Sequence, residues 1–362
     1  MRECRAGCLT HKGTRVASGG RMGDTSCPMP SRLAPLSIVP GSFAVADVVG
    51  VGREGRAVRV APSSIAAMRR SRAALESILG DGEPHYGVNT GFGSFSRQRI
   101  SNEDLRDLQR NLIRSHAAGV GEALPREVVR ATMLLLIGSL ARGHSGVRGK
   151  VVQALAAMLN AEVTPVVPSL GSCGASGDLA PLAHITLVAI GEGRAWVNGR
   201  EVAGGAALKT AGIQPVALEA KEGLALINGT HLMAAHGALL VYDFERLFDA
   251  ALIAAAMSID ACRATDAFLD PRVHAIRRQP GQIEVAAKLQ GLLRGSKIVP
   301  SHRLNDPRVQ DPYSLRCAPQ VLGAAWDAFV YMRGAVEQEP VSYTHLRAHE
   351  TKANLVCRLL LE

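Results

Sequence analysis

Residues 171–184 read GSCGASGDLAPLAH, a glycine-rich loop that leads directly into an apolar segment. Glycine has no Cβ, so a loop of this kind can turn tightly. The apolar residues from Leu179 to Ile190 have the length and spacing of a helix, and the positive end of that helix would face the loop. The segment therefore predicts a tight turn held at the N-terminus of a helix.

Most of the chain outside this loop shows helical periodicity. Pro62 begins one segment and Gly80 ends it, as proline and glycine commonly do at helix ends. The other expected helices cover residues 102–118, 125–142, 147–159, 179–190, 231–264, 282–293 and 318–336. Strands 195–197 and 200–202 flank Asn198-Gly199, the dipeptide of a type I′ hairpin turn. We expect a mainly α fold of long helices, with glycine-rich loops in its N-terminal part and a small β-hairpin accessory.

The composition narrows the class of protein further. The chain has 362 residues, of which 47% are hydrophobic and only 4% aromatic, so its core must consist of Ala, Leu, Val and Ile. The longest apolar run, residues 131–141, is about half as long as a membrane span. The net charge is +9, but no basic cluster contains interleaved aromatic residues. We therefore expect neither a membrane nor a nucleic acid as partner.

The cysteines and the N-terminal residues indicate the cellular compartment, and the spacing of His and Cys bears on metal binding. Cys173, Cys262 and Cys317 are scattered through the body of the chain, which is typical of reduced thiols in a cytoplasmic protein. No His or Cys spacing supports a metal site. Residues 1–30 have no periodicity and no apolar signal segment, so we expect a non-native or disordered extension, with Met22 or Met29 nearer the true start.

A series of distinctive strings lies along residues 35–338: YGVNTGFG, NLIRSHAAGVGE, GHSGVRG, GSCGASGDLAPLAH, KEGLALINGT, PGQ and VQDPYSLRCAPQVLGAA. In these strings and in their order, the chain resembles the aromatic amino acid ammonia-lyase family. The resemblance implies that Ala175, Ser176 and Gly177 cyclise without another enzyme into the electrophile 4-methylidene-imidazol-5-one (MIO). No external cofactor is then needed. The amide nitrogen of Gly177 closes the ring, which explains why a residue without Cβ stands there.

The same resemblance implies roles for five further residues. Tyr86 matches the base that removes the β-hydrogen, and Tyr313 matches a residue that supports it beside the electrophile. Arg316 matches the arginine that holds the substrate carboxylate, for which its planar fork is suited. Asn228 and Gln310 match residues that hydrogen-bond the MIO ring or the amino acid group of the substrate.

Substrate choice is expected to depend on Ser115 and His116. A Ser-His pair here resembles the histidine-specific members, which convert L-histidine into trans-urocanate and ammonia in the first step of histidine degradation. The alternatives within the family are tyrosine or phenylalanine ammonia-lyases and aminomutases that use the same electrophile. From another class, the chain could be an inactive fragment that acts only as a helical interaction protein. His184 is interpreted as a structural hydrogen-bonding residue.

The resemblance also predicts how the chain is organised. We expect an MIO-bearing catalytic region at residues 31–230 and an incomplete helical bundle at residues 231–340, while residues 341–362 look like translated adapter sequence. Family members assemble as homotetramers whose active sites use side chains from three subunits. Their C-terminal third also supplies an aromatic residue and a glutamate that have no counterpart here. We therefore expect this chain to fold poorly or to assemble without a competent site.

Overall fold

The computed structural model describes residues 34–40, 43–81, 83–85, 87–91, 100–101, 104–172 and 177–338. The expected N-terminal extension and the residues 341–362 lie outside these ranges. Within them the chain is mainly helical with a few short strands, so the predicted fold class is confirmed. No helix in the described ranges is both long enough and apolar enough to cross a membrane.

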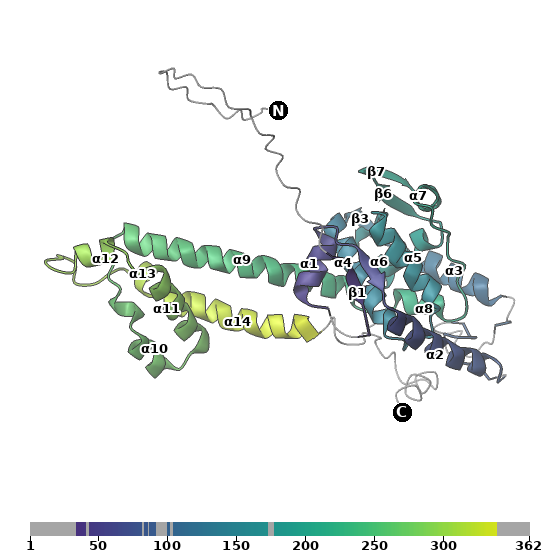
Figure 1. The fold of residues 1–362 in the computed structure, drawn as a ribbon, viewed down its shortest axis with the longest axis horizontal. Coiled ribbons are helices and arrows are strands. Elements are labelled where there is room, and N and C mark those ends of the chain that lie inside the picture. The colour runs from purple at the N-terminus through teal and green to yellow at the C-terminus, as the bar shows by residue number, and fades with distance from the viewer. Residues whose placement is uncertain are drawn as a thin grey trace, which may run out of the picture. The chain divides into compact units, whose positions relative to one another are not determined.

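The helices fall into two groups, one after the other along the chain (Figure 1). The first group contains α1 (Val45–Gly52), α2 (Pro62–Leu79), α3 (Leu105–His116), α4 (Arg126–Ala141), α5 (Gly149–Asn160), α6 (Leu179–Ala189), α7 (Gly204–Thr210) and α8 (Glu222–Ile227). The second contains α9 (His231–Ala261), the 3-10 turn η2 (Ala267–Leu269), α10 (Pro271–Arg277), α11 (Pro280–Leu292), α12 (Ile298–Ser301), α13 (Tyr313–Arg316) and α14 (Ala318–Gln338).

The strands form three small sheets. Strand β1 (Leu36–Ile38) pairs in parallel with β2 (Val58–Val60). Strand β4 (Thr164–Pro165) joins β6 (Arg194–Val197) and β7 (Arg200–Ala203) in an antiparallel sheet. The predicted hairpin is confirmed, because Asn198 and Gly199 both have positive φ, 49° and 76°, as a type I′ turn requires.

The sequence predicted only the β6–β7 hairpin, so β1, β2, β4 and one further antiparallel pair were not expected. Strand β3 (Val120–Ala123) pairs with β5 (Pro168–Leu170), and Val120 lies opposite Leu170. All four residues of β3 are exposed, so the segment has none of the apolar alternation by which a strand is normally predicted. The pair is important because it aligns the chain that leaves α3 with the chain that enters the 171–178 loop.

Helix α4 is the centre of the first hydrophobic core. It is buried on nearly every side, and Met133, Leu134, Leu136 and Ile137 are completely inaccessible. It packs against α1, α5 and the start of α9. A helix that is apolar all round belongs in a protein interior, which explains why its hydrophobic residues show little amphipathic bias.

Helix α9 connects this core to a second one. Leu232, Ala235 and Leu239, near its start, belong to the first hydrophobic cluster, whereas Phe248 and Leu252 belong to the second. In the second cluster α9 packs against α11 and α14. Aromatic rings help to hold α14 there, since Phe329 stacks on Phe244 with centroids 4.4 Å apart and Trp326 stacks on Phe248 at 4.7 Å. At 1.5 Å per residue, the 31 residues of α9 extend over about 46 Å.

The expected helices are present, with differences at their ends. Pro125 lies before the first turn of α4 as its N-cap and is not its first helical residue. Helix α9 ends at Ala261, three residues before the predicted end, and Arg263 turns the chain with a positive φ of 52°. The short helices α1, α7, α8, α10, α12 and α13 were not predicted, because a helix of four to eight residues is too short to show clear periodicity.

Candidate active site

Gly177 is the one triad residue among those that the structure describes; Ala175, Ser176 and the expected base Tyr86 lie outside the described ranges. Its φ is +74°, and it forms a parallel bridge with Gly229. A Cβ at Gly177 would lie 2.6 Å from the carbonyl oxygen of Gly229. Both the backbone angle and the space therefore require glycine at this position.

Asp178, the next residue, fixes this turn to the bundle. Its side chain is almost fully buried and accepts three hydrogen bonds. The donors are the hydroxyl of Ser172 at 2.5 Å and the backbone amides of Leu232 and Met233, at 2.7 and 3.2 Å. Asp178 stands at the N-cap of α6 but makes no side-chain bond to that helix. It caps α9 instead, a long-range contact that sequence reasoning missed.

Asn228 lies beside the same bridge. It follows α8 directly, and the carbonyl of its neighbour Gly229 accepts the Asp178 amide at 2.9 Å. The Asn228 side chain is buried, and its Oδ1 has no hydrogen-bond partner among the residues that the structure describes. A buried amide oxygen without a partner is unfavourable, so this atom is suited to accept a hydrogen bond from a further group in the site. The orphan oxygen and the cramped Gly177 turn both fit an MIO group built from residues 175–177.

A buried ionic cluster holds the first turn of α8. Both carboxylate oxygens of the fully buried Glu222 accept from Arg148, which also donates to Glu219. Burial disfavours the charged form of Arg148, but the hydrogen bonds and charges of Glu222 and Glu219 outweigh it and raise the pKa of Arg148. Arg72 extends the cluster, since it donates to Glu219 at 2.9 Å. The cluster therefore fixes the helix that carries Asn228.

The predicted specificity pair lies at the C-terminal end of α3. His116 Nδ1 is 2.9 Å from the carbonyl oxygen of Leu112, which can only accept a hydrogen bond. Nδ1 therefore carries the proton, and in a neutral ring Nε2 is an acceptor. The Ser115 hydroxyl donates to the same carbonyl at 2.9 Å and lies 3.1 Å from His116 Nδ1. Ser115 thus helps to orient the His116 ring.

The turn after His116 lies against the entry to the triad loop. A Cβ at Gly171 would meet Gly119 Cα at 3.4 Å and Ala180 Cβ at 3.1 Å, so these backbones approach closely. The Gly119 amide donates to His184 Nε2 at 3.2 Å. The structure therefore brings the His116 turn, Gly177 and Asn228 into one region, at the N-terminal end of α9.

Tyr313, Arg316 and Gln310 form a separate group around α13. The Arg316 guanidinium lies 3.9 Å from the centroid of the Tyr313 ring. With its amide oxygen turned towards Arg316, Gln310 accepts from both terminal nitrogens at 3.0 and 2.9 Å. Arg316 Nε is buried and has no partner within the described ranges, and the Tyr313 side chain is 70% exposed. This group presents one arginine in a fixed orientation beside an exposed phenol ring.

The two groups of predicted site residues lie at opposite ends of α9. Asp178 caps the N-terminus of that helix, whereas Asp311, two residues before Tyr313, accepts from the amide of Thr265 beyond its C-terminus. The two groups are therefore separated by most of the length of α9, which extends over about 46 Å. One copy of the chain therefore does not bring Tyr313 and Arg316 to Gly177.

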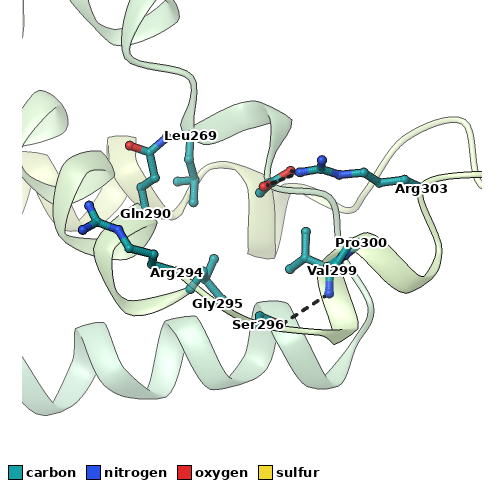
Figure 2. Close-up of a pocket in the computed structure, with 10 residues that line it drawn as sticks. Leu269, Gln290, Arg294, Gly295, Ser296, Val299, Pro300 and Arg303 are labelled. Atoms are coloured by element: carbon teal, nitrogen blue, oxygen red, sulfur yellow. Dashed lines mark hydrogen bonds and ion pairs between the residues drawn. The ribbon is translucent and has the colours of Figure 1, made fainter.

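A cavity of about 310 Å³ is lined by residues from Asp266 to Arg303, which follow α9 in the chain. Figure 2 shows the side chains that line it. Its walls include Leu269, Gln290, Arg294 and Val299, and Arg303 in its wall is paired with Asp266 at 2.9 Å. None of the predicted site residues lines this cavity. The described part of the chain also contains no cluster of three or more His, Cys, Asp or Glu side chains that could hold a metal ion.

These features define a class of helical protein in which a tight turn at a glycine is held against the N-terminus of a long helix, here Gly177 and α9. The chain belongs to the aromatic amino acid lyase family, because residues 43–345 match that family's model, described as aromatic amino acid lyase. It is 50% identical over 303 residues to a histidine ammonia-lyase of Gloeobacter violaceus. That match covers 84% of this chain and 59% of the relative, so the chain spans about three fifths of the relative's length.

Solved structures show the same similarity. The phenylalanine aminomutase of Pantoea agglomerans has a TM-score of 0.79 at 33% identity, and the match covers 86% of this chain and 63% of that one. The tyrosine aminomutase of Streptomyces globisporus gives 0.79 at 34% identity, covering 88% and 64%. The histidine ammonia-lyase of Trypanosoma cruzi gives 0.77 at 35% identity, covering 86% and 57%.

Proposed function

We propose that this protein eliminates ammonia from L-histidine to give trans-urocanate, the first step of histidine degradation. The observation that carries the proposal is the position of His116. Its Nδ1 is engaged with Leu112, so Nε2 is left as an acceptor, and Gly119, three residues further on, approaches Gly171 at the entry to the triad loop. An acceptor at this place suits the N–H of a substrate imidazole, which phenylalanine lacks. The 50% identical histidine ammonia-lyase supports the same substrate.

The reactive group of the proposed site is made from the chain itself. Ala175, Ser176 and Gly177 would form the MIO group, which would supply an electrophile for the amine or the ring of the substrate and so make the amine nitrogen a better leaving group. Gly177 fits this group because the turn has no room for a Cβ. Asn228 fits it because its buried Oδ1 is available to accept a hydrogen bond from the ring or from the substrate. Helix α6 begins at Leu179, and its N-terminus would stabilise negative charge at the turn.

The remaining roles belong to the tyrosines and to the α13 group. Tyr86 takes the β-proton as the base, and Tyr313 supports it. Arg316 holds the substrate carboxylate through its terminal nitrogens, an interaction that its planar fork favours. Gln310, which accepts from the same nitrogens, sets the orientation of the fork in the absence of substrate. The substrate is therefore held at its carboxylate by one group and at its imidazole by the other.

The distance between the two groups favours a site shared between copies. Because α9 separates Arg316 from Gly177 within one chain, the arginine must reach the turn from another copy. Helix α9 also exposes apolar side chains seven residues apart, Met233 at 61%, Leu240 at 56% and Leu247 at 67%. This spacing is typical of a helix that packs along another helix. We propose a homotetramer for the full-length form.

The same reasoning extends to the organisation and compartment of the protein. We propose that residues 31–230 form the MIO-bearing catalytic region and that residues 231–340 form part of the bundle. We also propose a cytoplasmic location, which the free thiols of Cys262 and Cys317 support.

An aminomutase is the second candidate function. The solved aminomutases of Pantoea agglomerans and Streptomyces globisporus match this chain with TM-scores of 0.79. Their identity, 33% and 34%, is lower than the 50% of the histidine ammonia-lyase relative, which favours the ammonia-lyase. An aminomutase would return a β-amino acid and no free ammonia, so the products distinguish the two.

The test compares substrates on two proteins. The first is the 362-residue chain, and the second is the same chain completed with the C-terminal part of the Gloeobacter violaceus relative. Each receives L-histidine, L-tyrosine or L-phenylalanine, and the unsaturated acid is followed by its absorbance while ammonia is measured separately. We expect the completed protein to use L-histidine at least about tenfold faster than the other two. Faster use of tyrosine or phenylalanine, or a β-amino acid as product, would overturn the proposal.

Sharing of the site between copies has its own experiment. Arg316→Ala and Gly177→Ala disable different groups, so either variant of the completed protein should be inactive alone. Co-expression of the two should restore activity if one copy supplies Arg316 and another supplies Gly177. Failure of every mixture to exceed the single variants would contradict a shared site.

A further inference from the structure

His184 joins two segments of the candidate site that are far apart in the sequence. It lies in α6, the helix that begins two residues after Gly177, and its Nε2 accepts the backbone amide of Gly119 at 3.2 Å. Gly119 is three residues after His116, in the turn between α3 and β3. A single hydrogen bond thus connects the helix behind the triad loop to the turn that follows the specificity residue.

The direction of this bond defines the state of the His184 ring. An amide N–H can only donate, so Nε2 must be unprotonated and the neutral ring carries its proton on Nδ1. Burial, and then the positive charge of Arg194 on β6, lower the pKa of His184 below its ordinary value of 6.5. The accepting form is therefore the favoured form at neutral pH.

The packing around Gly119 leaves little freedom for the turn. A Cβ at Gly119 would lie 3.2 Å from His184 Nε2 and 3.3 Å from Pro168 Cβ. On the other side, Gly171 approaches Gly119 closely, as described above. Gly119 thus lies against α6, β5 and the entry to the triad loop, while Ala118 is exposed. Among the described residues, His184 provides the one side-chain hydrogen bond to the turn.

We propose that His184 is a positioning residue that holds the 117–119 turn, and with it His116, at the distance from the triad loop that L-histidine requires. It acts through Gly119 and does not itself contact the substrate. The link between the position of His116 and L-histidine binding rests on the proposed function. The hydrogen bond from Gly119 to His184 and its effect on the turn do not depend on that function.

Hydrogen exchange of the full 362-residue chain tests the proposal. Peptides that cover residues 113–124 report the Gly119 amide in the unsubstituted chain, in His184→Leu and in His184→Gln. The glutamine side chain retains an oxygen that can accept from Gly119, whereas leucine cannot accept. We expect exchange at Gly119 to become about three- to tenfold faster in His184→Leu and to stay near the unsubstituted rate in His184→Gln.

The control is His236→Leu, which removes an exposed histidine from α9. It should leave the Gly119 rate unchanged. If His184→Leu unfolds the protein, exchange will rise in every peptide. In that case retained protection of the Gly119 amide in His184→Gln supports the hydrogen bond. Unchanged exchange at Gly119 in His184→Leu, or loss of protection in His184→Gln equal to that in His184→Leu, would overturn the proposal.

A kinetic measurement links the bond to substrate binding. In the completed protein used for the substrate test, His184→Leu should raise KM for L-histidine about tenfold with a smaller change in kcat, and His184→Gln should restore KM. A rise in Gly119 exchange with KM unchanged would overturn the link to substrate binding. Absence of turnover in the completed protein without substitutions would count against the proposed function, and exchange at Gly119 would still decide whether His184 holds the turn.

Discussion

The Asp178 carboxylate accepts the backbone amide of Leu232 at 2.7 Å, which ties the residue after the triad to the first turn of α9. Fifty-four residues separate the two in sequence. The first amides of a helix have no partner within the helix, so this carboxylate both satisfies them and opposes the positive end of the helix dipole. The turn at Gly177 is therefore positioned by the bundle helix as well as by its own loop.

Replacing Asp178 with alanine should destabilise the protein. The change removes the acceptor for Leu232, Met233 and Ser172, and a lost cap together with buried unpaired amides should lower the free energy of unfolding by about 2–4 kcal/mol. Urea unfolding followed by circular dichroism measures this difference. Asp249→Ala, at an exposed site on the same helix, is the control and should change the value by less than about 0.5 kcal/mol. Equal effects of the two substitutions would show that the cap is unimportant.

Gly177→Ala should lower the free energy of unfolding more than the same substitution at a glycine with a similar backbone angle. Gly199 has φ +76°, close to the +74° of Gly177, but a Cβ there meets nothing within 4 Å. Gly199→Ala should therefore lower the free energy of unfolding only by the backbone strain, about 1–2 kcal/mol. Gly177→Ala adds a clash with the Gly229 carbonyl, and we expect about 1–3 kcal/mol more. Melting curves of both variants measure the difference, and indistinguishable curves would contradict the close approach.

The buried pair of Arg148 and Glu222 should be far more sensitive than an exposed pair. Glu222→Gln leaves the Arg148 charge without its buried partner, so the free energy of unfolding should fall by about 3–5 kcal/mol. Glu201→Gln breaks the exposed Arg194–Glu201 pair in the hairpin and should change it by less than about 1 kcal/mol. Chemical denaturation of both variants in the same buffer tests this contrast. A loss of under 1 kcal/mol at Glu222 would mean that the cluster does not hold α8.

Stability should decrease on mild acidification. Burial, followed by a nearby arginine charge, lowers the pKa of His184 and of His144 below 6.5 in the folded chain. The unfolded chain then binds more protons than the folded one below that pH, so these histidines contribute stability that is complete above about pH 6.5 and lost as the pH falls. Denaturation at about pH 7.5 and 5.5 should show this decrease, and His184→Gln should reduce it. An identical pH dependence in that variant would contradict the assignment to His184.

Features with strong local signals could be predicted from the sequence. The helix from Pro62 to Leu79 has proline at its start, and the hairpin has Asn198-Gly199 at two turn positions that both need positive φ. The long helix from His231 was predicted because its apolar pattern persists over many turns. These elements depend on interactions between residues close together in the chain.

Contacts between distant segments could not be predicted in this way. Asp178 has the sequence position of a cap for α6, yet its carboxylate bonds α9, which only the folded chain reveals. The exposed residues of β3 form a strand because β5 is beside them. The roles of Arg316 and Gly177 follow from the resemblance to the family, which assigns roles to residues but not the distance between them within one chain. Their separation along α9 is visible only in the structure.

Mass analysis of the purified chain addresses whether residues 175–177 form the MIO group at all. Cyclisation and dehydration each release water, so the peptide that covers residues 171–184 should be about 36 Da lighter than its sequence. Gly177→Ala, in which the turn cannot close, should give a peptide of its full calculated mass. The proposal predicts the deficit in the unsubstituted chain alone. A full-mass peptide from a folded, unsubstituted chain would contradict it.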